Sequence, residues 1–320
     1  MRSLYDPEER TRLAPRLLPG ETAHWLERDG AMIHWMRRRA PAGAEDVRGT
    51  LVLVHGAASN ASRWEEFVET APLCRSRETI RLNLRGHASS SCSKRASLEI
   101  WSDDLEGMLA AAGVEHPVLV GHSLGAHVVM HLAARRPGLA SGLVLLDPLV
   151  SEALSQRALD MQRRRPWVRL LEALARAVNA CGVHRRLQPQ DLRAMDARAR
   201  EKIARGGREL EGFVREYSSP WADLRYIHAA CYLRDMLEAA RRSPAPGRLT
   251  APTLVIAASS GVYTDPALLA QWADRLPQGE VRTVQCLHWP LTECPHQVSR
   301  VIEEWLQKNA VGPERPAAGA

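Results

Sequence analysis

The most reactive group that the sequence indicates is a serine between two glycines. Ser123 lies in the pentapeptide Gly-His-Ser-Leu-Gly at residues 121–125, which follows a β-like apolar stretch at 117–120 and precedes a helix-period stretch at 126–136. Between a strand and a helix, the pattern G-x-S-x-G holds a strained serine whose hydroxyl can attack a carbonyl carbon. A plain glycine-rich turn is the alternative. We predict that Ser123 is a nucleophile.

A serine nucleophile needs partners, because its hydroxyl is protonated at neutral pH. A base within hydrogen-bond reach must accept the proton, and a carboxylate must orient that base. The sequence contains 12 histidines and 37 aspartates and glutamates. Residue type alone therefore does not select the partners, and the elements that position them must be identified.

Strand and helix patterns alternate along most of the chain. Asp29-Gly30 between two β-like segments predicts an antiparallel hairpin. Apolar stretches typical of buried strands follow at residues 50–54, 79–84, 117–120, 142–146, 253–257 and 280–285. Helix-period segments lie at residues 98–112, 124–135, 266–275 and 295–308. The alternation predicts an α/β fold with a mostly parallel, eight-stranded sheet and helices on both faces.

One interval, residues 151–249, breaks this alternation. It has helical spacing and no convincing strand, and it contains 20 Arg and Lys against 12 Asp and Glu. We predict a core formed by residues 1–150 and 250–310, an inserted helical cap at 151–249 and a disordered tail at 311–320. The arginine runs of the cap indicate a solvated face, with binding of an acidic or CoA-linked substrate as the alternative.

Four segments resemble the α/β-hydrolase superfamily, and the resemblance covers most of the chain outside the cap. Besides the serine motif, residues 51–56 (Leu-Val-Leu-Val-His-Gly) are similar to the family's third strand and its His-Gly turn. Residues 83–89 resemble its D-x-R-G-H-G-x-S loop, with Asn83 in place of the Asp. The resemblance implies the α/β-hydrolase fold. It also implies that the backbone N–H groups of Ala57 and Leu124 form an oxyanion hole.

The same resemblance selects His288 as the base. Residues 286–295 (Cys-Leu-His-Trp-Pro-Leu-Thr-Glu-Cys-Pro) follow the last predicted strand and are similar to the family's G-H-W-P-x-x-E-x-P segment. Leu287 stands where the family usually has a glycine. A buried structural histidine is the alternative for His288.

Two aspartates are candidates for the carboxylate. The family usually places it a few residues beyond the strand at 253–257, a register that falls on Gly261, so the expected acid is missing there. Asp265 comes shortly after, but it precedes a proline and a helical stretch, a pattern typical of a helix N-cap. Asp147 ends the strand at 142–146, where some superfamily members are known to place their acid. We predict Asp147, with Asp265 or no conventional acid as the alternatives.

Composition excludes several other classes of protein. The chain of 320 residues is 45% hydrophobic and 25% charged, which is typical of a globular protein and not of a disordered or fibrous one. No apolar stretch reaches the roughly 18 residues of a membrane span. The charged N-terminus does not resemble a secretory signal, so we expect a cytoplasmic protein. No metal, cofactor or nucleic-acid partner is expected, and the oligomeric state is not indicated.

We therefore expect a serine hydrolase that cleaves a small-molecule carboxylic ester or lactone with a Ser-His-Asp triad, through an acyl-enzyme intermediate. A thioesterase or C–C bond hydrolase with the same triad is one alternative, and a receptor-like small-molecule-binding protein with weak hydrolysis is another. Expected substrate contacts are His122, Trp221, Tyr226 and Trp289. Core packing of the cap is the alternative for its aromatic residues.

Overall fold

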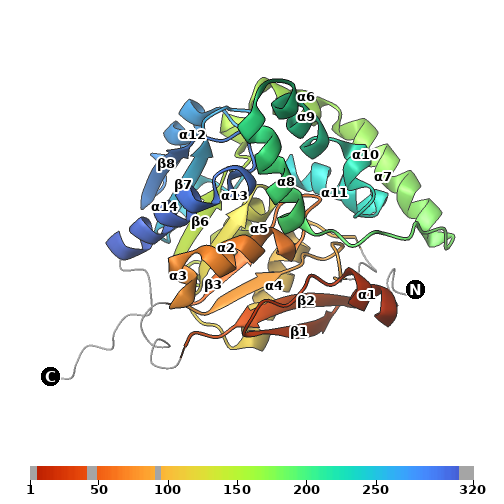
Figure 1. The fold of residues 1–320 in the computed structure, drawn as a ribbon, viewed down its shortest axis with the longest axis horizontal. Helices are drawn as coiled ribbons and strands as arrows, with labels where there is room; N and C mark the ends of the chain where they lie inside the picture. Colours follow the sequence, from red (N-terminus) through yellow and green to blue (C-terminus); the bar gives the residue numbers. More distant parts are fainter. Residues whose placement is uncertain (1–5, 42–48, 91–94, 310–320) are drawn as a thin grey trace.

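An eight-stranded sheet forms the centre of the molecule (Figure 1). A computed structural model describes residues 6–41, 49–90 and 95–309. The strand order is β1-β2-β4-β3-β5-β6-β7-β8, and β2 runs antiparallel to both of its neighbours while the other pairs are parallel. The strands are β1 (Glu21–Arg28), β2 (Ala31–Arg38), β3 (Leu51–Val54), β4 (Thr79–Leu82), β5 (Val118–His122), β6 (Gly142–Leu146), β7 (Thr253–Ala258) and β8 (Gly279–Val284). The predicted sheet is confirmed.

β1 and β2 form the predicted hairpin. Arg28 pairs with Ala31 across the turn, and the turn residues Asp29 and Gly30 have φ angles of 50° and 70°. Positive φ at both central positions is what a type I′ turn requires, and the twist of that turn matches the twist of paired strands. The Asp-Gly dipeptide therefore sets the register of the hairpin at one edge of the sheet.

Helices cover both faces of the sheet. The first face carries α4 (Leu98–Ala112), α5 (Leu124–Arg135) and α12 (Pro266–Ala273). The second face carries α2 (Glu65–Thr70), α3 (Pro72–Arg75) and α14 (Pro295–Lys308). In β3, Val52 and Val54 pack in the first layer, whereas Leu51 and Leu53 pack in the second. Because both faces of the strand are buried, its sequence is continuously apolar.

A helical stretch joins β6 to β7, where the sequence predicts an insertion. All of residues 151–249 are described, and none of them lies in a named strand. Figure 1 shows their helices, coloured green to cyan, gathered together beside the sheet. We call residues 151–249 the helical segment; its status as a separate cap stays a prediction. Its helices are α6 (Gln156–Arg163), α7 (Arg165–Ala180), α8 (Leu192–Arg205), α9 (Gly207–Tyr217), α10 (Pro220–Asp223) and α11 (Ala229–Ala239).

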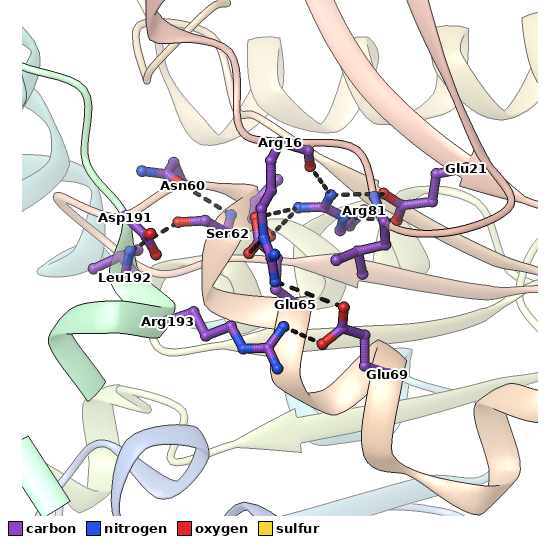
Figure 2. A network of polar contacts seen from close by, with 12 residues as sticks. Arg16, Glu21, Asn60, Ser62, Glu65, Glu69, Arg81, Asp191, Leu192 and Arg193 are labelled. Atoms are coloured by element: carbon purple, nitrogen blue, oxygen red, sulfur yellow. Dashed lines mark hydrogen bonds and ion pairs between the residues drawn. The ribbon is translucent and has the colours of Figure 1, made fainter. Parts of the chain in front are cut away.

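Polar contacts attach the start of α8 to the core (Figure 2). The N–H of Leu192 donates to the hydroxyl of Ser62 (3.1 Å), and Arg193 forms an ion pair with Glu69 of α2. Arg81 of β4 lies in the same network, where it is buried between two glutamates. The contacts of Leu192 and Arg193 therefore hold the start of α8 against the core, whereas Arg81 joins β4 to Glu21 of β1 and Glu65 of α2.

The remaining elements are short. They are α1 (Pro7–Leu13), η1 (Ala61–Trp64), η2 (Ser151–Ala153), η3 (Pro246–Arg248) and α13 (Pro290–Glu293). The tail predicted at 311–320 lies outside the described residues. Within the described ranges, no helix combines the length and the apolar composition that a membrane span needs. The cytoplasmic location stays a prediction.

Candidate active site

The predicted nucleophile lies on a sharp, strained turn. β5 ends at His122 and α5 begins at Leu124, so Ser123 alone connects the strand to the helix. Its φ of 50° and ψ of −113° form a sparsely populated conformation, which costs on the order of 1–3 kcal/mol. Its backbone N–H donates to the carbonyl of Leu146 (3.0 Å) at the end of β6. The surrounding strands therefore impose the strained backbone that the motif predicts.

Both glycines of the pentapeptide are required by close backbone contacts. A Cβ at Gly121 would lie 2.5 Å from the carbonyl oxygen of Gly125, and a Cβ at Gly125 would lie 2.3 Å from that of Val54. Neither neighbour is a flexible side chain, so neither clash could be relieved without moving the backbone. The G-x-S-x-G spacing thus follows from the tight packing of the first turn of α5 against both β5 and β3.

His288 and Asp147 lie in direct contact. Nδ1 of His288 is 2.5 Å from Oδ2 of Asp147, and both side chains are buried. Asp147 follows β6 with a φ of 39°, and its N–H donates to the carbonyl of Ile256 in β7 (2.8 Å). Its other oxygen, Oδ1, accepts from the N–H of Ala258 (3.3 Å). One carboxylate oxygen is therefore held by β7, and the other faces the imidazole.

The alternative acid, Asp265, lies at a helix N-terminus. Its Oδ1 accepts hydrogen bonds from the N–H groups of Ala267 (2.8 Å) and Leu268 (3.1 Å) in the first turn of α12. This is the N-cap that the Asp-Pro pattern indicates. Within the described residues, Asp265 makes no hydrogen bond to His288. The carboxylate that contacts the imidazole therefore follows β6 and not β7. The assignment of the triad acid to Asp147 stays a prediction.

A further carboxylate holds the loop that carries His288. Glu293 accepts hydrogen bonds from three consecutive backbone N–H groups, those of Leu287 (2.8 Å), His288 (3.2 Å) and Trp289 (3.0 Å). Burial raises the pKa of Glu293, and the three donors oppose that rise. Glu293 belongs to the segment 286–295 on which the resemblance depends, but the pattern alone does not reveal this supporting role.

Ser123 and His288 line one cavity of about 840 Å³. Its size is typical of a small-molecule site. Ala57, His122 and Trp289 line the same cavity. Ser123 and His288 both belong to the described part of the chain, and no hydrogen bond joins their side chains there. Hydroxyl–imidazole contacts of this kind often tighten only when substrate is bound.

Two backbone N–H groups beside Ser123 have no acceptor within the described part of the chain. They belong to Ala57, which lines the cavity, and to Leu124, the first residue of α5. A Cβ at Gly56 would lie 3.4 Å from the Cβ of Ser123, so the turn after β3 passes directly beside the serine. Free donors next to a nucleophile are what an oxyanion hole requires. The assignment of Ala57 and Leu124 to such a hole stays a prediction.

The helical segment also supports this turn. Oδ2 of Asp235, on α11, accepts from the N–H of Ala58 (2.9 Å) and lies 2.8 Å from Nε2 of His87. Asp235 is fully buried, and Ala58 directly follows Ala57. No local sequence pattern indicates this role of Asp235, because the turn that it supports lies far away in the chain.

His122 binds the loop of His288. Its Nε2 donates to the carbonyl oxygen of His288 (2.9 Å). Burial lowers the pKa of His122 to about 3, and the neighbouring imidazole of His288 contributes to the decrease. The ring of His122 is therefore neutral at pH 7, and Nε2 carries its hydrogen. His122 lines the cavity, as expected of a substrate contact, and it also positions the loop that carries the predicted base.

The aromatic residues predicted to contact substrate divide into two groups. Tyr226 and Trp289 line the cavity, and Trp289 packs edge-on against Phe213 of α9, with ring centroids 5.3 Å apart. Trp221 does not line the cavity and is 81% exposed. The structure contradicts the prediction for Trp221, because the single turn of α10 buries none of its own side chains and leaves the indole in solvent.

An unusual carboxyl group also lines the cavity. Burial, together with the nearby carboxylate of Asp235, raises the pKa of Asp223 to about 7, although Arg63 opposes the shift. A carboxyl group with that pKa is about half neutral at pH 7. The wall at Asp223 can therefore donate as well as accept a hydrogen bond.

The arrangement has the parts that acyl transfer needs. A strained serine, a carboxylate and free backbone donors lie at the carboxyl ends of β5, β6 and β3, and the imidazole that contacts the carboxylate comes from the loop after β8. Among the described residues, no group of three or more His, Cys, Asp or Glu side chains is placed to hold a metal ion.

Comparison with known proteins defines the class of the protein. Residues 49–295 match the family model described as alpha/beta hydrolase fold, and the chain belongs to this family. It is 29% identical to Lipase LipV of Mycobacterium tuberculosis, over 85% of this chain and 97% of the relative. It is 23% identical to a "Probable alcohol acetyltransferase" of Saccharomyces cerevisiae, over 82% of this chain and 78% of the relative. A thermophilic esterase from Thermogutta terrifontis has a similar fold, with a TM-score of 0.62 and 22% identity over 90% of this chain and 99% of the esterase.

Proposed function

We propose that the protein is a serine hydrolase that cleaves a carboxylic ester, lactones included. The contact of 2.5 Å between Nδ1 of His288 and Asp147 is the observation that carries this proposal. It supports a Ser-His-Asp triad, because Ser123 stands on the strained turn beside the same cavity. The lipase and the esterase among the similar proteins favour an ester as the substrate class.

The proposed reaction follows from these positions. Nδ1–H of His288 donates a hydrogen bond to Asp147, which leaves Nε2 as the basic nitrogen. Nε2 takes the hydroxyl proton of Ser123 as the serine oxygen attacks the ester carbonyl carbon, and the N–H groups of Ala57 and Leu124 stabilise the oxyanion. The imidazolium then protonates the departing alkoxide, and an acyl-enzyme remains. Water gives a proton to Nε2 as its oxygen attacks the acyl carbon. The bond between the acyl carbon and the serine oxygen then breaks, the imidazolium returns the proton to that oxygen, and the carboxylic acid leaves.

The helical segment selects the substrate in this proposal. Most of the residues that line the cavity belong to residues 151–249, while the reacting groups belong to the sheet and its loops. Apolar side chains such as Met161 and Leu237 favour an alkyl or acyl group, and Tyr226 and Asp223 offer hydrogen bonds to a polar part. A change in the helical segment would therefore alter the preferred ester more than the chemistry.

Acyl transfer to an alcohol is a second candidate, because one similar protein is a "Probable alcohol acetyltransferase". It would use the same acyl-enzyme with an alcohol in place of water. Thioester and C–C bond hydrolysis would use the same triad. A binding protein with weak hydrolysis is less well supported, since binding alone needs neither the strained Ser123 nor its neighbour pair Asp147 and His288.

A fluorophosphonate probe tests the nucleophile. We expect complete labelling of the wild-type protein and no labelling of Ser123→Ala. Ser141→Ala, which removes a hydroxyl at the far end of the sheet, should label like the wild type. A wild-type protein that does not label would contradict the proposal.

A substrate panel then distinguishes the candidate reactions. Esters of short and long acyl chains, lactones and acyl-CoA thioesters are compared by kcat/KM, with and without added alcohol. We expect an ester or lactone to exceed the thioesters by at least about ten-fold, a difference of about 1.4 kcal/mol in activation free energy. A preference for thioesters, or transfer to alcohol faster than hydrolysis, would replace ester hydrolysis as the function.

A further inference from the structure

The longest helix of the helical segment, α7, carries a row of exposed apolar side chains. Its members are between 50% and 70% exposed; they are Trp167, Leu170, Leu171, Leu174 and Val178. At 100° per residue they fall within a sector of about 100° of the helix surface. We call these five residues the α7 stripe. A contiguous apolar patch of this kind indicates an interaction surface.

The opposite side of α7 is fixed in place. Glu172 forms a buried ion pair with Arg234 of α11 (2.7 Å), and Val168 lines the cavity. Rotation of the helix to bury the stripe would break this ion pair and leave buried charges without partners. The stripe is therefore held toward solvent in the folded protein.

Arginines lie at both ends of the stripe. Arg163 and Arg164 precede the stripe, Arg185 and Arg186 follow α7, and all four are exposed. Residues 160–186 contain seven arginines against one Asp and one Glu. An apolar row that includes tryptophan and is bracketed by cations is typical of a helix that lies in the interface of an anionic bilayer.

A second copy of the chain fits this surface less well. The commonest dimer interface pairs one patch with itself around a two-fold axis. Such pairing of two α7 stripes would also bring together the basic ends of both helices. An anionic surface instead complements those charges.

We propose that the α7 stripe docks the protein on an anionic lipid surface. Arg164, Arg165 and Val168 line the cavity that contains Ser123, so the docked helix would form a wall between the lipid and the serine. Docking is independent of the proposed hydrolysis. If both hold, the substrate is an ester that enters from a lipid phase.

Vesicle sedimentation with the full chain tests docking. We expect binding to vesicles of phosphatidylcholine mixed with phosphatidylglycerol, and at least about ten-fold weaker binding by Leu170→Glu/Leu174→Glu. Ala173→Glu/Ala180→Glu is the matched control: it adds the same charges at exposed positions of α7 outside the stripe, and it should bind within about two-fold of the wild type. Arg185→Gln/Arg186→Gln should weaken binding to the mixed vesicles and leave any binding to vesicles of phosphatidylcholine alone unchanged, because only the mixed vesicles are anionic.

Three results would overturn the proposal: no wild-type binding to the mixed vesicles, equal losses in the two glutamate variants, or a wild-type dimer in lipid-free solution that Leu170→Glu/Leu174→Glu dissociates. Hydrolysis of a short, water-soluble ester is measured in parallel. Unchanged hydrolysis with lost vesicle binding in Leu170→Glu/Leu174→Glu supports docking as a separate property. Vesicle binding by a wild-type protein that hydrolyses nothing also supports docking and contradicts the proposed function alone.

Discussion

At the scale of single residues, the proposed chemistry depends on which tautomer His288 adopts. A neutral imidazole carries its hydrogen on either nitrogen, and only the tautomer with hydrogen on Nδ1 leaves Nε2 free to accept a proton from Ser123. The carboxylate of Asp147, 2.5 Å from Nδ1, selects that tautomer. An asparagine at this position could donate to Nδ1 and stabilise the other tautomer.

Substitution of the two aspartates should therefore have very different effects. We predict that Asp147→Asn lowers kcat for a short-chain ester by about 10³- to 10⁴-fold. Asp265→Asn should keep near wild-type kcat, because asparagine is also a good N-cap for α12. Thermal unfolding of both variants controls for misfolding. A large loss of kcat in Asp265→Asn, with a folded protein, would contradict the assignment of the acid to Asp147.

At the scale of elements, the serine turn is held by the packing of α5 on β3. The close approach leaves no room for a side chain at Gly125, whose Cβ would lie 2.3 Å from the carbonyl oxygen of Val54. This contact, together with the turn, positions Ser123 at the end of the sheet. The serine turn therefore depends on the packing of two elements, α5 and β3.

Gly125→Ala tests this packing. We predict that it lowers the free energy of unfolding by more than about 4 kcal/mol, because the backbone of β3 or α5 must move. Gly212→Ala is the matched control in α9, since its Cβ would meet no heavy atom within 4 Å; it should be neutral or stabilise by up to about 1 kcal/mol. Urea unfolding measures both. If Gly125→Ala were as stable as the wild type, the serine turn would tolerate a wider separation of α5 from β3, and this prediction would be wrong.

At the scale of the whole molecule, one carboxylate joins the helical segment to the core. Asp196 of α8 pairs with Arg63 of η1 and accepts hydrogen bonds from the hydroxyls of Tyr217 (2.9 Å) and Thr292 (3.0 Å). Arg63 and Tyr217 both line the cavity. The same group therefore holds the two parts of the chain together and shapes the space between them.

Loss of Asp196 should consequently affect both stability and substrate binding. We predict that Asp196→Ala lowers the free energy of unfolding by about 3–5 kcal/mol, because the buried Arg63 loses its ion pair, and that it raises KM. Lys202 lies on the same helix as Asp196. Lys202→Ala removes its exposed ion pair with Glu216 of α9 and should cost less than about 1 kcal/mol. Equal losses in the two variants, measured by urea unfolding, would contradict this role.

The helices and strands could be predicted from sequence because local patterns specify them. The continuous apolar stretch of β3 reflects burial on both faces, and Asp29-Gly30 reflects a turn with two positive φ angles. Trp221 shows the limit of such patterns. Its aromatic neighbourhood suggests a binding site. The direction of a side chain on a single helical turn, however, depends on packing that the local sequence does not encode.

The sequence by itself determined the fold family, the strained serine and the loop of His288, because each is specified by neighbours along the chain. Only the tertiary structure decided which aspartate meets the imidazole. Asp147 and Asp265 both follow strands of one sheet, and the choice between them depends on distances between separate loops. The tertiary structure likewise decided the roles of Asp235 and Glu293 and the outward direction of the α7 stripe. These depend on contacts between side chains and backbone that only the packed chain brings together.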